Sequence, residues 1–161
     1  MTFTKGAKDG KHYWLTPAPL MKRLKAEFHF DYDPCPYPLP EGYNGLTAEW
    51  GSSSYVNQPF ETVIVEGRKK GPTAWARKAL AEVEKGKEVV IVFPIDKWVL
   101  MLIEAGVEIR NLGDVKWQAT EDKGAHAGTG RHIAMFVMNP KAMKLERKRR
   151  AKRINYKEPK Q

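Results

Sequence analysis

A continuous apolar run, Val89–Phe93, lies between a charged segment and Pro94. Strands that are buried on both faces have such unbroken runs of β-branched and aromatic residues, whereas half-exposed strands alternate apolar and polar residues. The run therefore predicts a central parallel strand over Glu88–Pro94. Helical patterns over Thr73–Lys85 and Asp96–Glu104 flank it. This alternation of helix and strand predicts an α/β sheet with helices on both faces.

The N-terminal part of this sheet is predicted from two neighbouring patterns. Apolar residues at helical spacing indicate a helix over Ala18–Glu27, with Thr16 as its cap and Pro17 as its first residue. Phe28–Asp33 alternates apolar and polar residues, which predicts a strand that Pro34 ends. Three further strands are predicted over Val107–Arg110, around Val115–Trp117 and over Arg131–Met138.

The chain is expected to form one principal domain. Its 161 residues and 42% hydrophobic content suit a single core. We expect residues 13–140 to form this domain, after a flexible arm at residues 1–12 and before a basic helix or tail at residues 141–161.

The single cysteine, Cys35, excludes an intrachain disulfide and favours a reducing, intracellular setting. The N-terminus lacks the apolar segment of a secretory leader, and the longest apolar runs, such as Trp98–Ile103, are too short to span a bilayer. The histidines and Cys35 show no metal-ligand spacing. We therefore expect a cytoplasmic protein with no membrane segment and no metal site.

Lysine and arginine number 28 against 19 acidic residues, which gives a net charge of +9. Such an excess favours a polyanionic partner, nucleic acid first. A basic stretch within Glu61–Gly71 is expected to be a mobile, substrate-facing loop, with a surface hairpin as the alternative. The basic tail could equally be only a solvated segment. The residues predicted to contact nucleic acid are Arg68, Lys69, Lys70, Arg147, Arg149 and Arg150.

The four residues Asn57-Gln58-Pro59-Phe60 follow a short apolar step and have the chemistry to hold an exocyclic amine. The Asn57 side-chain oxygen and the Gln58 backbone carbonyl can each accept one N–H. Pro59 stiffens the turn, and Phe60 can stack on a base. Two such hydrogen bonds favour a tetrahedral nitrogen whose lone pair points at a methyl donor. The alternative is a strand end followed by an ordinary Asn-Xaa-Pro turn.

With these residues in place, the chain resembles the phage-type DNA N6-adenine methyltransferase family. The resemblance runs in order from Trp14 to about Asn139. The segments that carry it are Trp14–Pro17, Glu27–Asp33, Asn44–Leu46 through Trp50, Val56–Phe60, Trp75–Ala79 and the strand that ends at Pro94.

The resemblance implies a Rossmann-like sheet that binds S-adenosylmethionine, with Asn57–Phe60 as the catalytic tetrad and DNA as the partner. It also implies a host-cell cytoplasmic location if the protein is phage-encoded. The chain departs from the family where Gln58 replaces the usual first proline and Asn44 replaces a usual aspartate. The residues that the resemblance assigns to the cofactor are Thr16, Pro17, Asp33, Pro34, Asn44 and Leu46.

Two other functions are compatible with these residues. The departures at Gln58 and Asn44 allow a degenerate methyltransferase that only binds nucleic acid. The same amine-holding residues would also serve the N4 amine of cytosine. Asp33, taken alone, could equally be an acidic cap of its turn.

Overall fold

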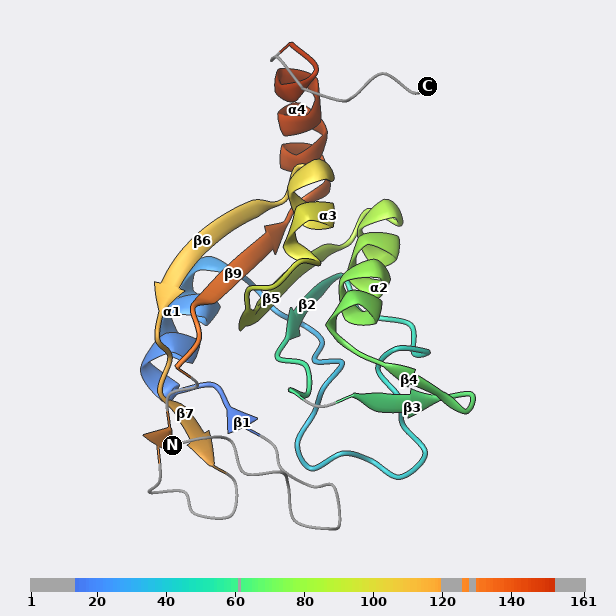
Figure 1. The fold of residues 1–161 in the computed structure, drawn as a ribbon, viewed down its shortest axis with the longest axis vertical. Coiled ribbons are helices and arrows are strands. Elements are labelled where there is room, and N and C mark those ends of the chain that lie inside the picture. The colour runs from blue at the N-terminus through green and yellow to red at the C-terminus, as the bar shows by residue number, and fades with distance from the viewer. Residues whose placement is uncertain (1–13, 61, 120–125, 128–129, 153–161) are drawn as a thin grey trace.

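The structure is a computed structural model that describes residues 14–60, 62–119, 126–127 and 130–152 (Figure 1). A four-stranded sheet forms its centre, in the spatial order β2 (Ser53–Val56), β5 (Glu88–Pro94), β9 (Ile133–Met138) and β6 (Glu108–Gly113). The helices are α1 (Ala18–Glu27), α2 (Pro72–Glu84), α3 (Val99–Glu104) and α4 (Pro140–Arg150). A second sheet contains β1 (Trp14–Leu15), β7 (Trp117–Ala119) and β8 (His126–Ala127), and a hairpin contains β3 (Val63–Val65) and β4 (Arg68–Lys70).

The central sheet is mixed, so the expected Rossmann-like methyltransferase sheet is wrong. β2 and β5 are its one parallel pair of adjacent strands, with Val56 opposite Ile91. β9 lies between β5 and β6 and runs antiparallel to both, with Phe136 opposite Ile91 and Ile109. A Rossmann-like sheet is instead built mostly from parallel strands joined by crossover helices. The sequence did not reveal this difference because a strand buried on both faces has the same apolar pattern in either direction.

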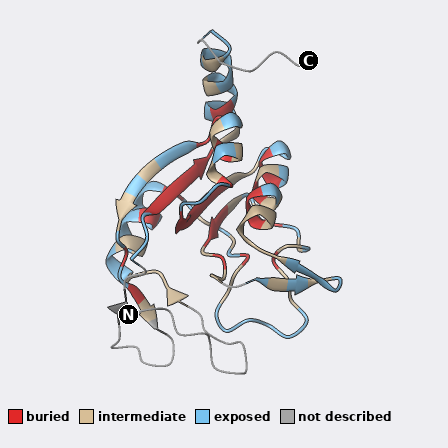
Figure 2. Cartoon of the chain, viewed as in Figure 1, coloured by how far each residue is buried: buried red, intermediate tan, exposed pale blue. Residues whose placement is uncertain are grey.

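The predicted strand at Glu88–Pro94 is present and covered on both faces, but the prediction of parallel neighbours holds only for β2, because β9 runs antiparallel to it. Alternate residues of β5 enter two different apolar clusters. Ile91 and Phe93 pack on the side of α2 and α3, whereas Val90 and Val92 pack on the side of α1 and β7. Figure 2 shows β5 and β9 as the most continuously buried elements.

The segment Phe28–Asp33 is not the predicted strand. Within it, only Tyr32 pairs with the sheet, through a parallel bridge to Ser54. The Asp31 carboxylate accepts hydrogen bonds from the backbone N–H groups of Ser52 and Ser53. The Ser53 N–H group is therefore not available to extend the pairing beyond Tyr32. Because the bridge at Tyr32 is parallel to β2, Asp33 lies at the same edge of the sheet as Asn57, which follows β2.

Helix α1 has the predicted bounds, but its predicted cap is wrong. Pro17 occupies the N-cap position and no side chain caps the helix. The Thr16 hydroxyl is instead bonded to the Tyr55 hydroxyl at 2.6 Å. Helix α3 begins at Val99, later than the predicted Asp96.

The basic segment before α2 forms a hairpin, so the expected loop is wrong and the alternative is correct. β3 and β4 pair antiparallel, with Val65 opposite Arg68. The two connecting residues, Glu66 and Gly67, have φ angles of 49° and 71°. Positive φ at both positions is typical of the type I′ turn that matches strand twist. The predicted arm at residues 1–12 and the last residues of the basic tail lie outside the described residues.

A buried carboxylate ties α2 to the start of β5. The side chain of Glu82 is fully buried and accepts hydrogen bonds from Lys78, Lys85 and Lys87. Burial alone would raise the pKa of Glu82, but the hydrogen bonds from these ammonium groups outweigh it and lower the pKa to about 2. Lys87 also donates to the Trp50 carbonyl, which extends this anchor to the segment before β2.

We expect the free energy of unfolding to fall as pH is lowered from about 4.5 toward 2. Glu82 has a lowered pKa when folded, so its stabilisation is complete above its ordinary pKa of 4.5 and is lost as pH falls through the folded value. Urea unfolding at several pH values measures this loss. Glu82→Gln should cost roughly 1–3 kcal/mol at neutral pH and flatten the acid dependence. An equally steep dependence in the variant would contradict the assignment.

Candidate functional site

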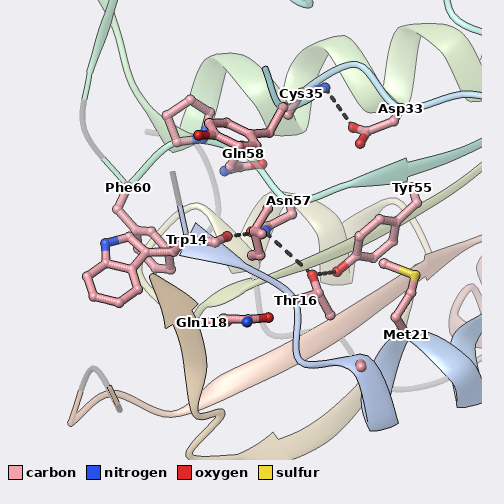
Figure 3. Close-up of a pocket in the computed structure, with 14 residues that line it drawn as sticks. Trp14, Thr16, Met21, Asp33, Cys35, Tyr55, Asn57, Gln58, Phe60 and Gln118 are labelled. Atoms are coloured by element: carbon pink, nitrogen blue, oxygen red, sulfur yellow. Dashed lines mark hydrogen bonds between the residues drawn. The ribbon is translucent and has the colours of Figure 1, made fainter. Parts of the chain in front are cut away.

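A cavity of about 290 Å³ lies at the carboxyl end of β2 (Figure 3). Three of the segments that form its walls are the turn before α1, the turn after Tyr32 and the segment after Val56. Tyr32 and β2 run parallel, so the residues that follow them meet at the same edge of the sheet. β1 and β7 contribute the facing wall through Trp14 and Gln118. The predicted site residues that line the cavity are Thr16, Asp33, Asn57, Gln58, Pro59 and Phe60.

The Asn57 side chain is held in one orientation. Its Nδ2 donates to the Trp14 carbonyl at 2.7 Å and lies 3.5 Å from the Thr16 hydroxyl. A carbonyl can only accept, so it fixes the amide nitrogen toward Trp14. The Asn57 Oδ1 is left buried, with no hydrogen-bond partner among the described residues. Asn57 therefore offers an acceptor that is oriented in advance.

Thr16 and Tyr55 form hydrogen bonds that help to hold the Asn57 side chain. The Tyr55 ring is buried on the α1 side of the sheet, and its hydroxyl reaches the Thr16 hydroxyl. Burial raises the pKa of Tyr55, against a smaller lowering by the bond to Thr16, so the phenol stays neutral. The sequence assigned Thr16 to a cofactor, whereas the structure places it between Tyr55 and Asn57. The sequence pattern did not indicate this role for Trp14, because its carbonyl, not its side chain, makes the contact.

Gln58 and Phe60 differ in their contacts within the protein. The Gln58 side chain is 1% exposed, and neither of its amide atoms has a described partner. Phe60 stacks on Phe93 with ring centroids 5.2 Å apart and meets Trp117 edge-on at 5.5 Å. The Phe93 stack occupies one face of the Phe60 ring, so that face cannot stack on a base.

Asp33 and Cys35 line another side of the cavity. The Asp33 carboxylate accepts the Cys35 backbone N–H at 2.8 Å, which closes a turn. Partial desolvation raises the pKa of Asp33, and this backbone hydrogen bond opposes the rise. Burial, followed by the nearby Asp33 charge, raises the pKa of Cys35 well above its ordinary value. Cys35 is therefore a neutral thiol and a poor nucleophile at neutral pH.

The remaining predicted cofactor residues do not line the first cavity. Pro34 and Asn44 line a neighbouring cavity of about 210 Å³, which shares Cys35 and Pro59 with the first. The Asn44 Oδ1 already accepts the Leu46 backbone N–H at 2.9 Å. Leu46 itself packs against the core, and Pro17 only begins α1.

The predicted basic contacts divide into two groups at opposite ends of the molecule. Arg68, Lys69 and Lys70 lie on the hairpin, at the same end as the carboxyl edge of β2 (Figure 1). Helix α4 projects from the other end. Arg147 donates to the Ala105 carbonyl at 2.8 Å, and Arg150 donates to the Ile103 carbonyl. These two arginines therefore pair with backbone carbonyls at the C-terminal end of α3, whereas Arg149 is exposed.

Neither a metal centre nor a membrane span is found in the described ranges. No group of three or more His, Cys, Asp or Glu side chains there could hold a metal ion. No helix among the same residues has the length and apolar character needed to cross a bilayer.

Comparisons of the chain with protein-family models, with curated proteins and with solved structures find no match. Functional inference therefore depends on the chemistry of the two adjoining cavities and on the charge around them.

The Thr16–Tyr55 hydrogen bond should contribute measurably to stability. Thr16→Val leaves the buried Tyr55 hydroxyl without this partner and should cost about 1–3 kcal/mol in urea unfolding. Tyr55→Phe removes the hydroxyl and should cost less. In a double-mutant cycle with both changes, the two effects should be non-additive by about 0.5 kcal/mol or more. Additive effects would show that the two hydroxyls do not interact.

Proposed function

We propose that this protein transfers a methyl group from S-adenosylmethionine to the N6 amine of adenine in DNA. The observation that supports this most directly is the Asn57 amide. Its nitrogen is held by the Trp14 carbonyl, and its buried oxygen faces no described donor. An exocyclic amine is a donor of the kind that this oxygen lacks.

The residues of the first cavity would act on the amine by orientation. The Asn57 Oδ1 accepts one N–H and the Gln58 backbone carbonyl accepts the other. Both bonds strengthen as the nitrogen becomes tetrahedral, so they stabilise the transition state more than the ground state. The nitrogen bonds to the methyl carbon as the carbon–sulfur bond breaks, and it then releases one proton to solvent. Phe60 lines the same cavity and would bound the space that the base enters.

The chain also has features that fit the methyl donor. S-adenosylmethionine supplies an electrophilic methyl group when bound. The Asp33 carboxylate suits the donor's ammonium group, and it lies on the wall of the first cavity. The neighbouring cavity offers aromatic surface from Tyr43 and Trp75, and the buried Trp75 Nε1 has no described partner. We assign the adenosyl part of the donor to this second cavity.

DNA would approach from the hairpin side of the molecule. Arg68 and Lys69 are exposed beside the end of the sheet that carries both cavities. Their charges suit phosphates, which position a protein on DNA without specifying sequence. A base within a duplex must leave the stack to reach a buried amide. Part of the binding energy therefore has to come from these phosphate contacts.

Asn57→Ala should lower the rate of methyl transfer by at least about a hundredfold, because it removes the oriented acceptor. Transfer of labelled methyl groups to unmethylated DNA measures the rate, and calorimetry should show that donor binding persists. Asn111→Ala is the matched control, since Asn111 is exposed on β6 outside both cavities. Full activity in Asn57→Ala would rule out its proposed role.

Analysis of nucleosides from the treated DNA separates the alternative functions. N6-methyladenine supports the proposal, whereas N4-methylcytosine would move the same chemistry to cytosine. Failure of the wild-type protein to bind the donor in calorimetry would favour a protein that only binds nucleic acid.

Replacing both Arg68 and Lys69 with alanine should weaken DNA binding and lower the salt slope of log affinity by about two. The pair Lys148→Ala and Arg149→Ala removes the same charges from exposed positions on α4, at the far end of the molecule. Fluorescence anisotropy over a range of salt concentrations compares the two variants. The α4 variant should lose less affinity and keep more methyl transfer. Equal losses would contradict an approach from the hairpin side.

A further inference from the structure

The side chain of Gln58 has no role in the mechanism above. That mechanism uses the backbone carbonyl of residue 58, which any amino acid would supply. The side chain is nevertheless 1% exposed and lines the same cavity as Asn57. Neither its Oε1 nor its Nε2 has a hydrogen-bond partner among the described residues.

A buried amide without partners is costly, because it has lost its hydrogen bonds to water and gained none in return. An apolar side chain of similar size would fill the same space without this cost. The arrangement is therefore better suited to a ligand than to the stability of the free protein. Both amide atoms are shielded from solvent in the free protein, as is the Asn57 Oδ1.

The chemistry of the amide identifies the part of the ligand that it fits. A glutamine amide offers a donor and an acceptor side by side. Adenine and cytosine carry a ring nitrogen that accepts a hydrogen bond next to the exocyclic amine, and glutamine pairs with such edges. Keto bases present a carbonyl oxygen beside a ring N–H. The Asn57 oxygen, held in place through Trp14, would repel that carbonyl oxygen.

We propose that the Gln58 side-chain amide is a specificity determinant that donates from Nε2 to the ring nitrogen beside the target amine. This assignment rests on the proposed function, because it takes the amine at Asn57 as its starting point. Gln58 and Asn57 together would recognise an amino nucleobase by three hydrogen bonds: two to the amine and one to the ring. A proline at position 58 would supply the backbone acceptor alone.

The test uses thymine oligonucleotides that carry one central adenine, 1-deazaadenine or 7-deazaadenine. Each deaza base replaces one ring nitrogen with C–H and leaves the amine and the phosphates unchanged. Fluorescence anisotropy of the labelled single strands measures binding. The wild-type protein should bind adenine roughly tenfold more tightly than one of the two deaza bases.

Gln58→Met keeps the bulk of the side chain and removes the amide, so it should bind all three bases alike. Its thermal stability should equal or exceed that of the wild type, because it removes an unpaired buried amide. Gln58→Leu provides a second variant. Its side chain has no hydrogen-bonding group, so it should also lose the preference for adenine. Equal binding of the three bases by the wild type, or an unchanged preference in Gln58→Met, would overturn the assignment.

Failure of this assignment can be told apart from failure of the proposed function. Methyl transfer by the wild type, combined with an unchanged preference in Gln58→Met, would overturn the Gln58 role and keep the function. A preference for adenine that depends on Gln58, without methyl transfer, would keep the base-reading role and overturn the enzyme.

Discussion

The parallel pairing of β2 with β5 is the constraint on which the site depends. It fixes where β2 ends, and Asn57 follows directly at that edge. The bridge between Tyr32 and Ser54 is also parallel, so Asp33 lies at the same edge as Asn57. β5 can hold this position because its alternate side chains are buried in two separate apolar clusters. A strand buried on both faces cannot slip by one residue without exchanging its two faces.

The cavity at this edge contains two kinds of polar group: those with hydrogen-bond partners in the protein and those without described partners. Backbone and hydroxyl groups, including the Trp14 carbonyl and the Thr16 hydroxyl, are used to hold side chains in place. The amide atoms that these contacts leave unpaired are on Asn57 and Gln58. Unpaired buried amides lower stability, and they cluster where a ligand could pair with them. The core around β5 provides the stability that makes such a site tolerable.

The positive charge of the chain serves more than one purpose. Lys78, Lys85 and Lys87 neutralise the buried Glu82, and Arg147 and Arg150 satisfy the carbonyls at the end of α3. These groups stabilise the fold, so net charge overstates what is available to a polyanion. The hairpin carries cations that are exposed and lie at the end of the sheet with the cavities. Position in the fold, more than the number of charges, therefore distinguishes cations that are available to a partner from those that stabilise the fold.

Local patterns in the sequence were enough to predict the buried strand at Glu88–Pro94, the bounds of α1 and the chemistry of Asn57–Phe60, because periodicity and composition are local properties. Strand direction could not be predicted in this way, since β9 has an apolar pattern compatible with either direction. The partners of Thr16 and Asn57 were likewise hidden, because they lie 39 and 43 residues away along the chain. One of them is a backbone carbonyl, which every residue has. Hydrogen bonds between distant segments depend on how the elements pack against one another, and local sequence patterns do not predict that packing.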